Sequence, residues 1–249
     1  MRVTMWCLVL GSAWAAALVA AEAVRATDTA DELLVDRFLS RDEQPLASYT
    51  GTRCLEATNQ RFNVTGSMRV RVHLSPERGF EWTVLQEQGS GYIRNKVLRK
   101  ALEGERDMVA RGEPARAALS LDNYEMRLEP EDVTGDGLAT ARLLLVPRRA
   151  DILLVRGSVL VTDPEADLLE VRGRLSKSPS WWTTRVDVVR TYERVAGVRV
   201  PVEMSSTAQV RIAGRSQFRM TSAFEQVNGR ATGIAAAACT AKPGAWTRA

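Results

Sequence analysis

Apolar and polar residues alternate along much of the chain, with the period of two that a half-buried β-strand requires. The pattern is clearest at Met68, Val70, Val72 and Leu74, which alternate with polar side chains. Similar alternation returns at residues 80–84, 124–128, 169–175, 198–204, 208–212 and 218–224. Turn signals separate most of these stretches, at 76–79, 134–137, 163–164, 196–197, 213–214 and 228–229. Such short connections predict an antiparallel meander.

Two stretches have a helical period instead. Residues 30–40 follow the capping-box pair Thr29 and Glu32 and carry one apolar stripe. Residues 91–110 combine an apolar face with a strongly charged one, which is typical of an amphipathic helix. The sequence therefore predicts one β-rich domain with two helices.

Three runs are apolar on successive residues and so lack the alternation: 143–146, 152–155 and 159–161. A strand that is apolar on both faces is expected to be covered on both faces. The helices can cover one side. The other side requires a second sheet, a sheet that curls on itself, or a bound ligand, and a fully filled interior remains the alternative.

The first residues predict export. Arg2 precedes an apolar run over 5–20, and Ala21-Glu22-Ala23 has the small residues that signal peptidase accepts. The run is shorter than the ~20 residues that a membrane-spanning helix needs. We therefore expect a signal peptide over 1–23, a released periplasmic protein rather than an integral membrane protein, one domain over 24–229 and a disordered tail over 230–249.

Composition and charge narrow the partners. The chain has a formal net charge of +4, but its arginines are spread along the sequence, so a nucleic-acid partner is not predicted. Once the leader is removed, Cys54 and Cys239 are the remaining cysteines. In an oxidising compartment they form either one disulfide or two unpaired thiols.

Catalytic and metal sites lack their usual residues. The chain has one histidine, His73, on the polar side of an alternating strand, and it has no Gly-x-Ser-x-Gly motif. One histidine and two separated cysteines do not make a zinc site. Residues 132–137 imitate a calcium loop, but Leu143 stands where the loop requires a glutamate, so a hairpin turn is predicted. We expect neither a metal nor a cofactor, and no enzymatic activity.

Two local features leave alternatives open. Ser90, Gly91 and Arg94 begin the second helix, so Ser90 acts as its N-cap or the three residues hold a phosphate or carboxylate. Trp181 and Trp182 are adjacent, and neighbouring residues of a strand point to opposite faces. One indole is therefore expected in the core and the other near an opening, where it either packs at the rim or contacts a ligand or a membrane.

The order of elements resembles that of the periplasmic outer-membrane lipoprotein-sorting and carrier family, which shares its fold with an envelope-stress sensor. The likeness covers roughly residues 30–228 and is carried by Leu46-Ala-Ser-Tyr-Thr-Gly-Thr52, by Val159–Pro164 with Leu168–Val171, and by Pro201 and Gly214. It implies an α+β fold, a strongly curved antiparallel half-barrel sheet whose two main helices cover the concave side. It also implies a lipid or acyl chain in that hollow and an arginine inside it, for which Arg53, Arg69 and Arg71 are candidates.

Together these features predict an exported envelope protein that binds a lipid, an acyl chain or a lipoprotein in its hollow. The alternatives are a sensor that contacts another envelope protein and a carboxylate-dependent hydrolase. The ligand-binding candidates at the hollow and its rim are Arg53, Arg69, Arg71, Trp82, Trp181 and Trp182.

Overall fold

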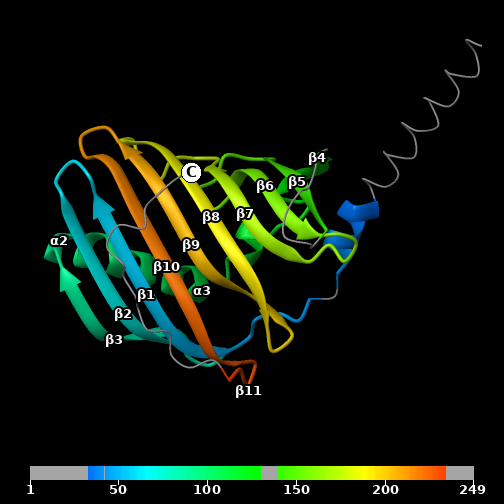
Figure 1. Cartoon of the computed structure of the whole chain (residues 1–249), viewed down its shortest axis with the longest axis horizontal. Coiled ribbons are helices and arrows are strands. Elements are labelled where there is room, and N and C mark those ends of the chain that lie inside the picture. Colours follow the sequence, from blue (N-terminus) through cyan, green and yellow to red (C-terminus); the bar gives the residue numbers. More distant parts are fainter. Residues whose placement is uncertain (1–32, 42, 130–138, 234–249) are drawn as a thin grey trace, which may run out of the picture.

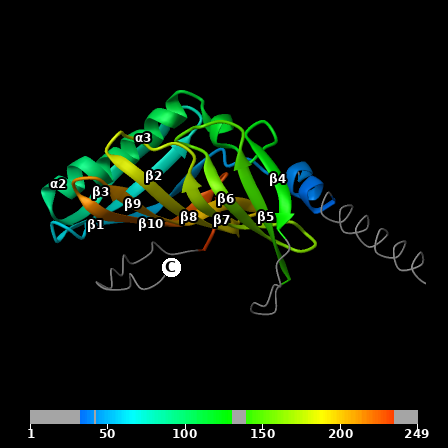
Figure 2. The same ribbon diagram turned by 90° about the horizontal axis from the view of Figure 1, so that it is seen from above.

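One antiparallel sheet dominates the computed structural model, which describes residues 33–41, 43–129 and 139–233. Its strands follow the order β3-β2-β1-β10-β9-β8-β7-β6-β5-β4, and β11 pairs with β10. The strands are β1 Tyr49–Asn59, β2 Val64–Ser75, β3 Gly79–Gly89, β4 Tyr124–Glu129, β5 Thr140–Pro147, β6 Val155–Thr162, β7 Leu168–Leu175, β8 Thr183–Val195, β9 Val198–Val210, β10 Gly214–Val227 and β11 Arg230–Ala231. The sheet is open and strongly curved (Figures 1 and 2), as predicted.

The curvature gives the sheet a concave face and a convex face, and strand register shows which residues share each one. Directly paired residues lie on the same face. One concave row crosses most of the sheet through Val171, Arg190, Met204, Met220, Leu55 and Met68. The residues next to these in sequence therefore point to the convex face.

Two helical segments pack against the concave side. The longer one is continuous from Gly91 to Ala110 and consists of α2 (Gly91–Ile93), the π-helical η1 (Arg94–Leu98) and α3 (Arg99–Ala110). It lies over β1–β3 (Figure 2). The shorter one covers residues 33–40 near the opposite end of the sheet. A 3₁₀ turn, η2, follows at Pro114–Ala117.

Each helical segment covers a core of its own. The first core lies beneath α2–α3, where Ile93, Leu98 and Leu102 meet apolar residues of β1, β2, β3, β9 and β10. The second core lies on β4–β7 and includes Leu34 from the helix over 33–40. The cores use part of the apolar stripes predicted for the two helices: Leu34 and Phe38 face the second core and Ile93 and Val97 the first, whereas Leu33 is exposed.

Three predictions about the strands need correction. Of residues 152–155, only Val155 belongs to a strand, as the first residue of β6; residues 152–154 form a turn, in which the Leu153 N–H donates to Asp151 Oδ1 at 3.0 Å. Residues 198–204 and 208–212 belong largely to one long strand, β9. The tail predicted to be disordered from residue 230 continues as β11, which pairs Arg230 with Val227.

Several predictions fall outside the described residues: the signal peptide over 1–23, the turn at 134–137, and the tail beyond residue 233, with Cys239. Within the described ranges, none of the helices is sufficiently long and apolar to cross a bilayer.

Candidate functional site

Arg53 is the arginine that lies inside the hollow. It comes from β1, between Gly51 and Leu55 on the concave face, and it is 4% exposed. Its guanidinium donates to Glu105 of α3 at 2.5 Å and 3.0 Å and to the Tyr49 hydroxyl at 2.6 Å. It also lies over the rings of Phe80 and Tyr49, at 5.2 Å and 5.6 Å from their centroids. The sheet and its long helix are therefore joined by a buried, charged contact.

The charges of this contact shift the titration of its members. Burial alone would lower the pKa of Arg53, but the Glu105 carboxylate reverses this and holds the pKa above its ordinary value. Burial raises the pKa of the Tyr49 hydroxyl, which keeps it neutral. Arg53 thus stays charged, Tyr49 stays uncharged, and Glu105 supplies the balancing carboxylate.

Arg69 and Arg71 lie on the convex face, so they are not in the hollow. They pair with Cys54 and Thr52, the neighbours of Arg53 on the other side of β1. Arg71 forms an ion pair with Glu225 at 3.0 Å.

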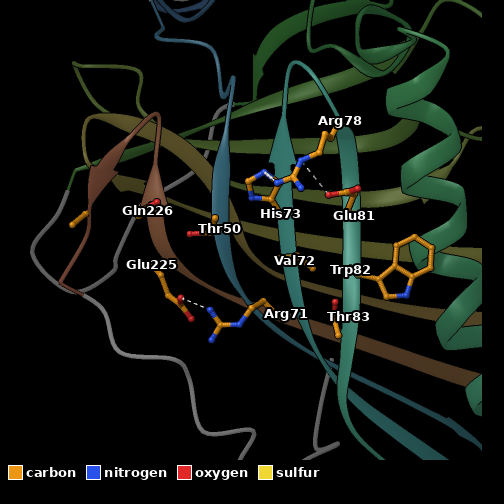
Figure 3. Close-up of a pocket in the computed structure, with 11 residues that line it drawn as sticks. Thr50, Arg71, Val72, His73, Arg78, Glu81, Trp82, Thr83, Glu225 and Gln226 are labelled. Carbon is orange, nitrogen blue, oxygen red and sulfur yellow. Dashed lines mark hydrogen bonds and ion pairs between the residues drawn. The ribbon is translucent and has the colours of Figure 1, made fainter.

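Arg71 borders a shallow depression of about 520 Å³ on the convex face. Its charged side chains are already paired with one another, Arg78 with Glu81 at 3.6 Å and Arg71 with Glu225 (Figure 3). His73 contacts Arg78 there at 3.2 Å. Trp82 borders the same depression, but its indole points away from these charges, toward the helix (Figure 3). Because its charges are mutually satisfied, this depression is a poor candidate for ligand binding.

Trp82 packs on the concave side, against the first core. Its ring lies 6.0 Å from that of Phe80, and the Arg106 guanidinium of α3 covers it at 5.6 Å. Trp82 is therefore part of the contact between β3 and the long helix.

Ser90, Gly91 and Arg94 use their polar groups within the protein. Ser90 Oγ accepts from the Ile93 N–H at 3.4 Å, which is the N-cap alternative. The Arg94 guanidinium pairs with Glu87, which also binds Arg99 at 2.7 Å. Because Arg94 already has a carboxylate partner, the geometry does not favour the predicted anion site.

Trp181 and Trp182 lie in the connection before β8, and neither belongs to a strand. They are 75% and 47% exposed, and their rings meet edge to face at 5.2 Å. The expectation that one indole is buried in the core was therefore wrong, because it assumed the alternation of a strand.

Between the two helix-covered cores, the concave face is only partly covered. We call this region the central strip. Its side chains come from β8, β9 and β10, are intermediate in exposure, and comprise Arg190, Val202, Met204, Ser206, Phe218 and Met220. Four of the six are apolar. Three of these four, Val202, Phe218 and Met220, also pack against the first core, so the central strip is a partly exposed apolar surface that borders this core.

Arg190 differs from Arg53 in that none of the described carboxylates pairs with it. It stands between Val171 and Met204 on the concave face, and it forms no ion pair with any residue in the described part of the chain. Its charge opposes the rise in the pKa of Tyr124 that burial produces, which places it near the second core. An uncompensated cation beside an apolar surface suits a ligand with an apolar chain and an anionic head.

Cys54 is disulfide-bonded and faces the convex side of β1. Its pairing with Cys239 stays a prediction, which peptide mapping under non-reducing conditions would check. Across residues 33–41, 43–129 and 139–233, no group of three or more His, Cys, Asp or Glu side chains is arranged to hold a metal ion.

Sequence analysis missed Glu105 and Arg190. The helical period of residues 91–110 places Glu105 on the charged face, which is expected to face solvent. Arg190 lies in β8, which is not among the stretches whose alternation predicts a strand. The phase of Val186, Val188, Arg190 and Tyr192 was the available signal, because it puts one arginine among apolar residues of the same face.

No protein-family model matches the chain, and no curated protein matches it. Solved structures similar to it include a DUF1329 family protein from Desulfovibrio piger (11% identity, TM-score 0.37) and a LolA superfamily protein from Nitrosomonas europaea (9% identity, TM-score 0.37). Each likeness covers 78% of this chain and 90% of the other.

A domain assigned to outer-membrane lipoprotein sorting, from Vibrio parahaemolyticus, is similar at 10% identity and a TM-score of 0.36, over 78% of this chain and 92% of that one. These are proteins of the kind that the sequence resembles. At such TM-scores we draw no function from the likeness, and the central strip has to carry the functional conclusion.

Proposed function

We propose that this protein binds a lipid or the acyl chain of a lipoprotein along the central strip, as an exported, non-catalytic binding protein. The observation that carries the proposal is the partly exposed apolar surface of Met204, Phe218 and Met220 at the centre of a concave sheet. Apolar side chains on the inner face of a curved sheet are normally covered by other protein atoms. Here a ligand supplies the missing cover.

The energetics favour an acyl chain. Each methylene removed from water contributes about 0.8 kcal/mol, so a chain of ~12 carbons contributes roughly 10 kcal/mol before the entropic cost of binding is deducted. This is sufficient for binding without any polar contact. Selectivity would then depend on how many carbons the strip accommodates and on the group at its charged end.

Arg190 supports an anionic head group. A hydrogen bond between an arginine and a carboxylate or phosphate is roughly twice as strong as one between neutral groups. Arg190 is joined to Met204 across the β8–β9 pairing, so a chain lying on Met204 brings its head within reach of the guanidinium. Free fatty acids and phospholipids both satisfy this arrangement.

The long helix is the element that would move to lengthen the site. Its contacts with the sheet are concentrated on β3 and on the first core, beside the central strip. Met220 links the two regions, because it packs against the first core and belongs to the strip. A longer chain would therefore extend from the strip toward the underside of the helix.

Blocking the strip is the direct test. Ser206 faces the strip, whereas its neighbour Ser205 pairs with Val189 and Arg219 on the convex face. We expect Ser206→Trp to abolish binding of N-phenylnaphthylamine and of fatty acids, and Ser205→Trp to leave both unchanged. Equal binding by the two variants would refute the proposal, and equal unfolding midpoints would show that both are folded.

Arg190→Gln separates the head group from the chain. We expect the affinity for a fatty-acid anion to fall roughly 10-fold or more, because a charge-assisted hydrogen bond contributes about 1.5–3 kcal/mol. The affinity for the uncharged N-phenylnaphthylamine should not change. Arg174→Gln is the control, since Arg174 pairs with Asp187 on the convex face. If neither dye nor lipid binds the wild-type protein, the alternative of a sensor that contacts another envelope protein is favoured instead.

A further inference from the structure

Exposed apolar residues gather at one edge of the sheet. Nine large hydrophobic residues are exposed among the described residues. Seven of them lie in connections at the same edge, where Leu121 precedes β4 and Ile152 lies between β5 and β6. The other five stand in four neighbouring connections, and we call these five the aromatic rim: Phe62 between β1 and β2, Tyr92 after β3, Trp181 and Trp182 between β7 and β8, and Ile212 between β9 and β10. Three are at least 70% exposed: Tyr92, Trp181 and Ile212.

Backbone hydrogen bonds join these connections into one surface. The Gln60 N–H donates to Arg215 O at 3.1 Å, which joins the β1–β2 and β9–β10 turns. The Arg211 N–H donates to Trp182 O at 2.8 Å, which joins the β9–β10 turn to the β7–β8 connection. The two tight turns lie together at the upper edge of Figure 1. The aromatic rim is therefore continuous at least from Phe62 to Trp181.

The rim is basic. Its connections, residues 60–63, 90–92, 176–182 and 211–213, contain Arg61, Lys177 and Arg211 and no aspartate or glutamate. Within the described part of the chain, none of these three cations forms an ion pair. The surface thus combines protruding indole, phenyl and aliphatic groups with unpaired positive charge.

The opposite edge of the sheet has the reverse character. Its connections at 76–78, 163–167, 196–197 and 228–229 contain Glu77, Asp163, Glu165 and Asp167 but only one cation, Arg78. None of the large hydrophobic residues that are exposed lies in these connections. At that edge the Asp167 carboxylate is paired with Arg41 and Arg194. Exposed apolar side chains and unpaired cations therefore occur together at the rim and not at the opposite edge, which favours one orientation of the molecule near an anionic surface.

We infer that the aromatic rim docks on the surface of a lipid bilayer that carries anionic head groups. Indole side chains favour the interface between hydrocarbon and water, and each lysine or arginine near an anionic leaflet strengthens binding. Stable attachment of a peripheral protein requires two such signals together, and the rim supplies both. Docking uses residues outside the central strip, so it does not depend on the proposed function.

Vesicle binding of the exported protein, expressed from the complete chain, tests this inference. We expect binding to vesicles that contain about a third phosphatidylglycerol, weaker binding to pure phosphatidylcholine, and a loss of binding as salt rises from about 0.05 M to 0.5 M. Equal binding to both vesicles at both salt concentrations would overturn the inference, as would retention by a protein partner but not by either vesicle.

Matched variants locate the contact. Trp181→Ser/Ile212→Ser should lower the vesicle partition coefficient roughly 10-fold or more, because both side chains would lose buried apolar area. Leu33→Ser/Leu85→Ser also removes two exposed hydrophobic residues, 58% and 47% exposed, but neither lies at the edge that carries the rim, and it should leave partitioning unchanged. Similar losses in the two double variants would contradict a localised contact.

Charge and depth are measured separately. Arg61→Gln/Lys177→Gln/Arg211→Gln should weaken binding to the anionic vesicles roughly 100-fold, at a factor of about five for each cation. Brominated lipids should quench tryptophan fluorescence in the wild-type protein, and Trp181→Phe/Trp182→Phe should bind and lose most of the quenching. Ser206→Trp should still dock, so that failure of lipid binding in the strip and failure of docking are distinguishable.

Discussion

The two ends of the concave face are covered by helices that are attached in different ways. The long helix covers the first core with Ile93, Leu98 and Leu102 and ends its contact in the buried pair of Arg53 and Glu105. The short helix over 33–40 buries mainly Leu34 and is followed by a surface network of charges. The long helix is therefore attached by a buried ion pair, and the short helix by ion pairs at the edge of the sheet.

The surface network centres on Asp167 in the turn between β6 and β7. Asp167 accepts ion pairs from Arg41 at 2.6 Å and from Arg194 at 2.7 Å, and it also contacts Arg199. Glu43 pairs with Arg194 at 3.1 Å. Because several ion pairs near solvent join the same segments, no single one of them is expected to contribute most of the free energy of unfolding.

A charge buried at the first cover has a different consequence. Removing one member of a buried pair leaves the other without compensation. A single substitution that leaves Arg53 unpaired beneath the long helix should therefore lower the free energy of unfolding strongly. Replacement of both partners by apolar residues should lower it only weakly. The central strip lies between these two covers.

The largest effect is expected at Glu105. Glu105→Leu leaves the Arg53 guanidinium buried and unpaired, which should lower the free energy of unfolding by about 3–5 kcal/mol. Arg53→Met should lower it less, because the Glu105 side chain that remains is 26% exposed and can be hydrated. Arg53→Met/Glu105→Leu should restore much of the loss. Urea unfolding measures all three, and equal effects of the two single variants would contradict a buried charge at Arg53.

The next largest effect is expected when a buried leucine of either helical segment is shortened to alanine. Leu98 is fully buried beneath η1, whereas Leu34 is 7% exposed in a short helix. Leu98→Ala should lower the free energy of unfolding by about 2–5 kcal/mol, and Leu34→Ala should fall at the low end of that range because the short helix can adjust. A larger effect for Leu34→Ala would show that the second cover is the more firmly packed one.

The dependence of the free energy of unfolding on pH should differ between the regions of the first and the second core. Burial raises the pKa of Tyr49, so its stabilising contribution is present below the ordinary value of about 10 and is lost as the pH rises above it. Tyr49→Phe should reduce the loss of stability between about pH 9 and pH 11. Tyr124 of the second core also has a pKa raised by burial, so Tyr124→Phe serves as the comparison at that end.

Low pH should lower the stability of the region around the second core by protonating Asp151. Burial opposes ionisation of Asp151, but the Leu153 N–H and Arg116 outweigh it and lower its pKa. Its contribution is therefore present above the ordinary value of about 3.9 and is lost as the pH falls. Asp151→Asn should lower the free energy of unfolding by about 1–3 kcal/mol at neutral pH and flatten the decline between about pH 5 and pH 3. A decline as steep as that of the wild-type protein would assign acid sensitivity to other carboxylates.

Sequence could predict the strands and the long helix because each has a regular period that burial enforces. The alternation at Met68 to Leu74 corresponds to β2, and the stripe of Ile93 and Val97 corresponds to the buried side of the long helix. It could not tell Arg53 from Arg69 and Arg71, because parity along a strand does not say which face is concave. That choice depends on the pairing of β1 with β10 and on Glu105 of the long helix, which is 52 residues away in the sequence.

The predictions for residues 152–155 and for the indoles at 181–182 were wrong for a related reason. Both sequences are apolar, and apolarity alone does not separate a strand from a connection that buries one residue or exposes two. Leu154 is fully buried from within a turn, while Trp181 is exposed at the edge of the sheet. Their positions are set by contacts with distant segments, such as the hydrogen bond from the Ser176 N–H to Leu154 O at 2.8 Å.

The smallest effect is expected from the surface network of the second cover. Asp167→Asn removes the shared partner of Arg41, Arg194 and Arg199, but Glu43 remains to pair with Arg194 at 3.1 Å and with Arg199, whose side chain is 7% exposed, at 3.5 Å. Ion pairs that are open to water each contribute about 0–1 kcal/mol. We expect a loss of about 1 kcal/mol or less in the free energy of unfolding, which shrinks further as salt rises to about 0.5 M. The loss from Glu105→Leu should persist at the same salt, because a buried charge is poorly screened. Urea unfolding of the two variants at low and high salt thus distinguishes attachment by a buried ion pair from attachment by ion pairs at the edge of the sheet. A loss of stability in Asp167→Asn that does not depend on salt would show that both helices are attached in the same way.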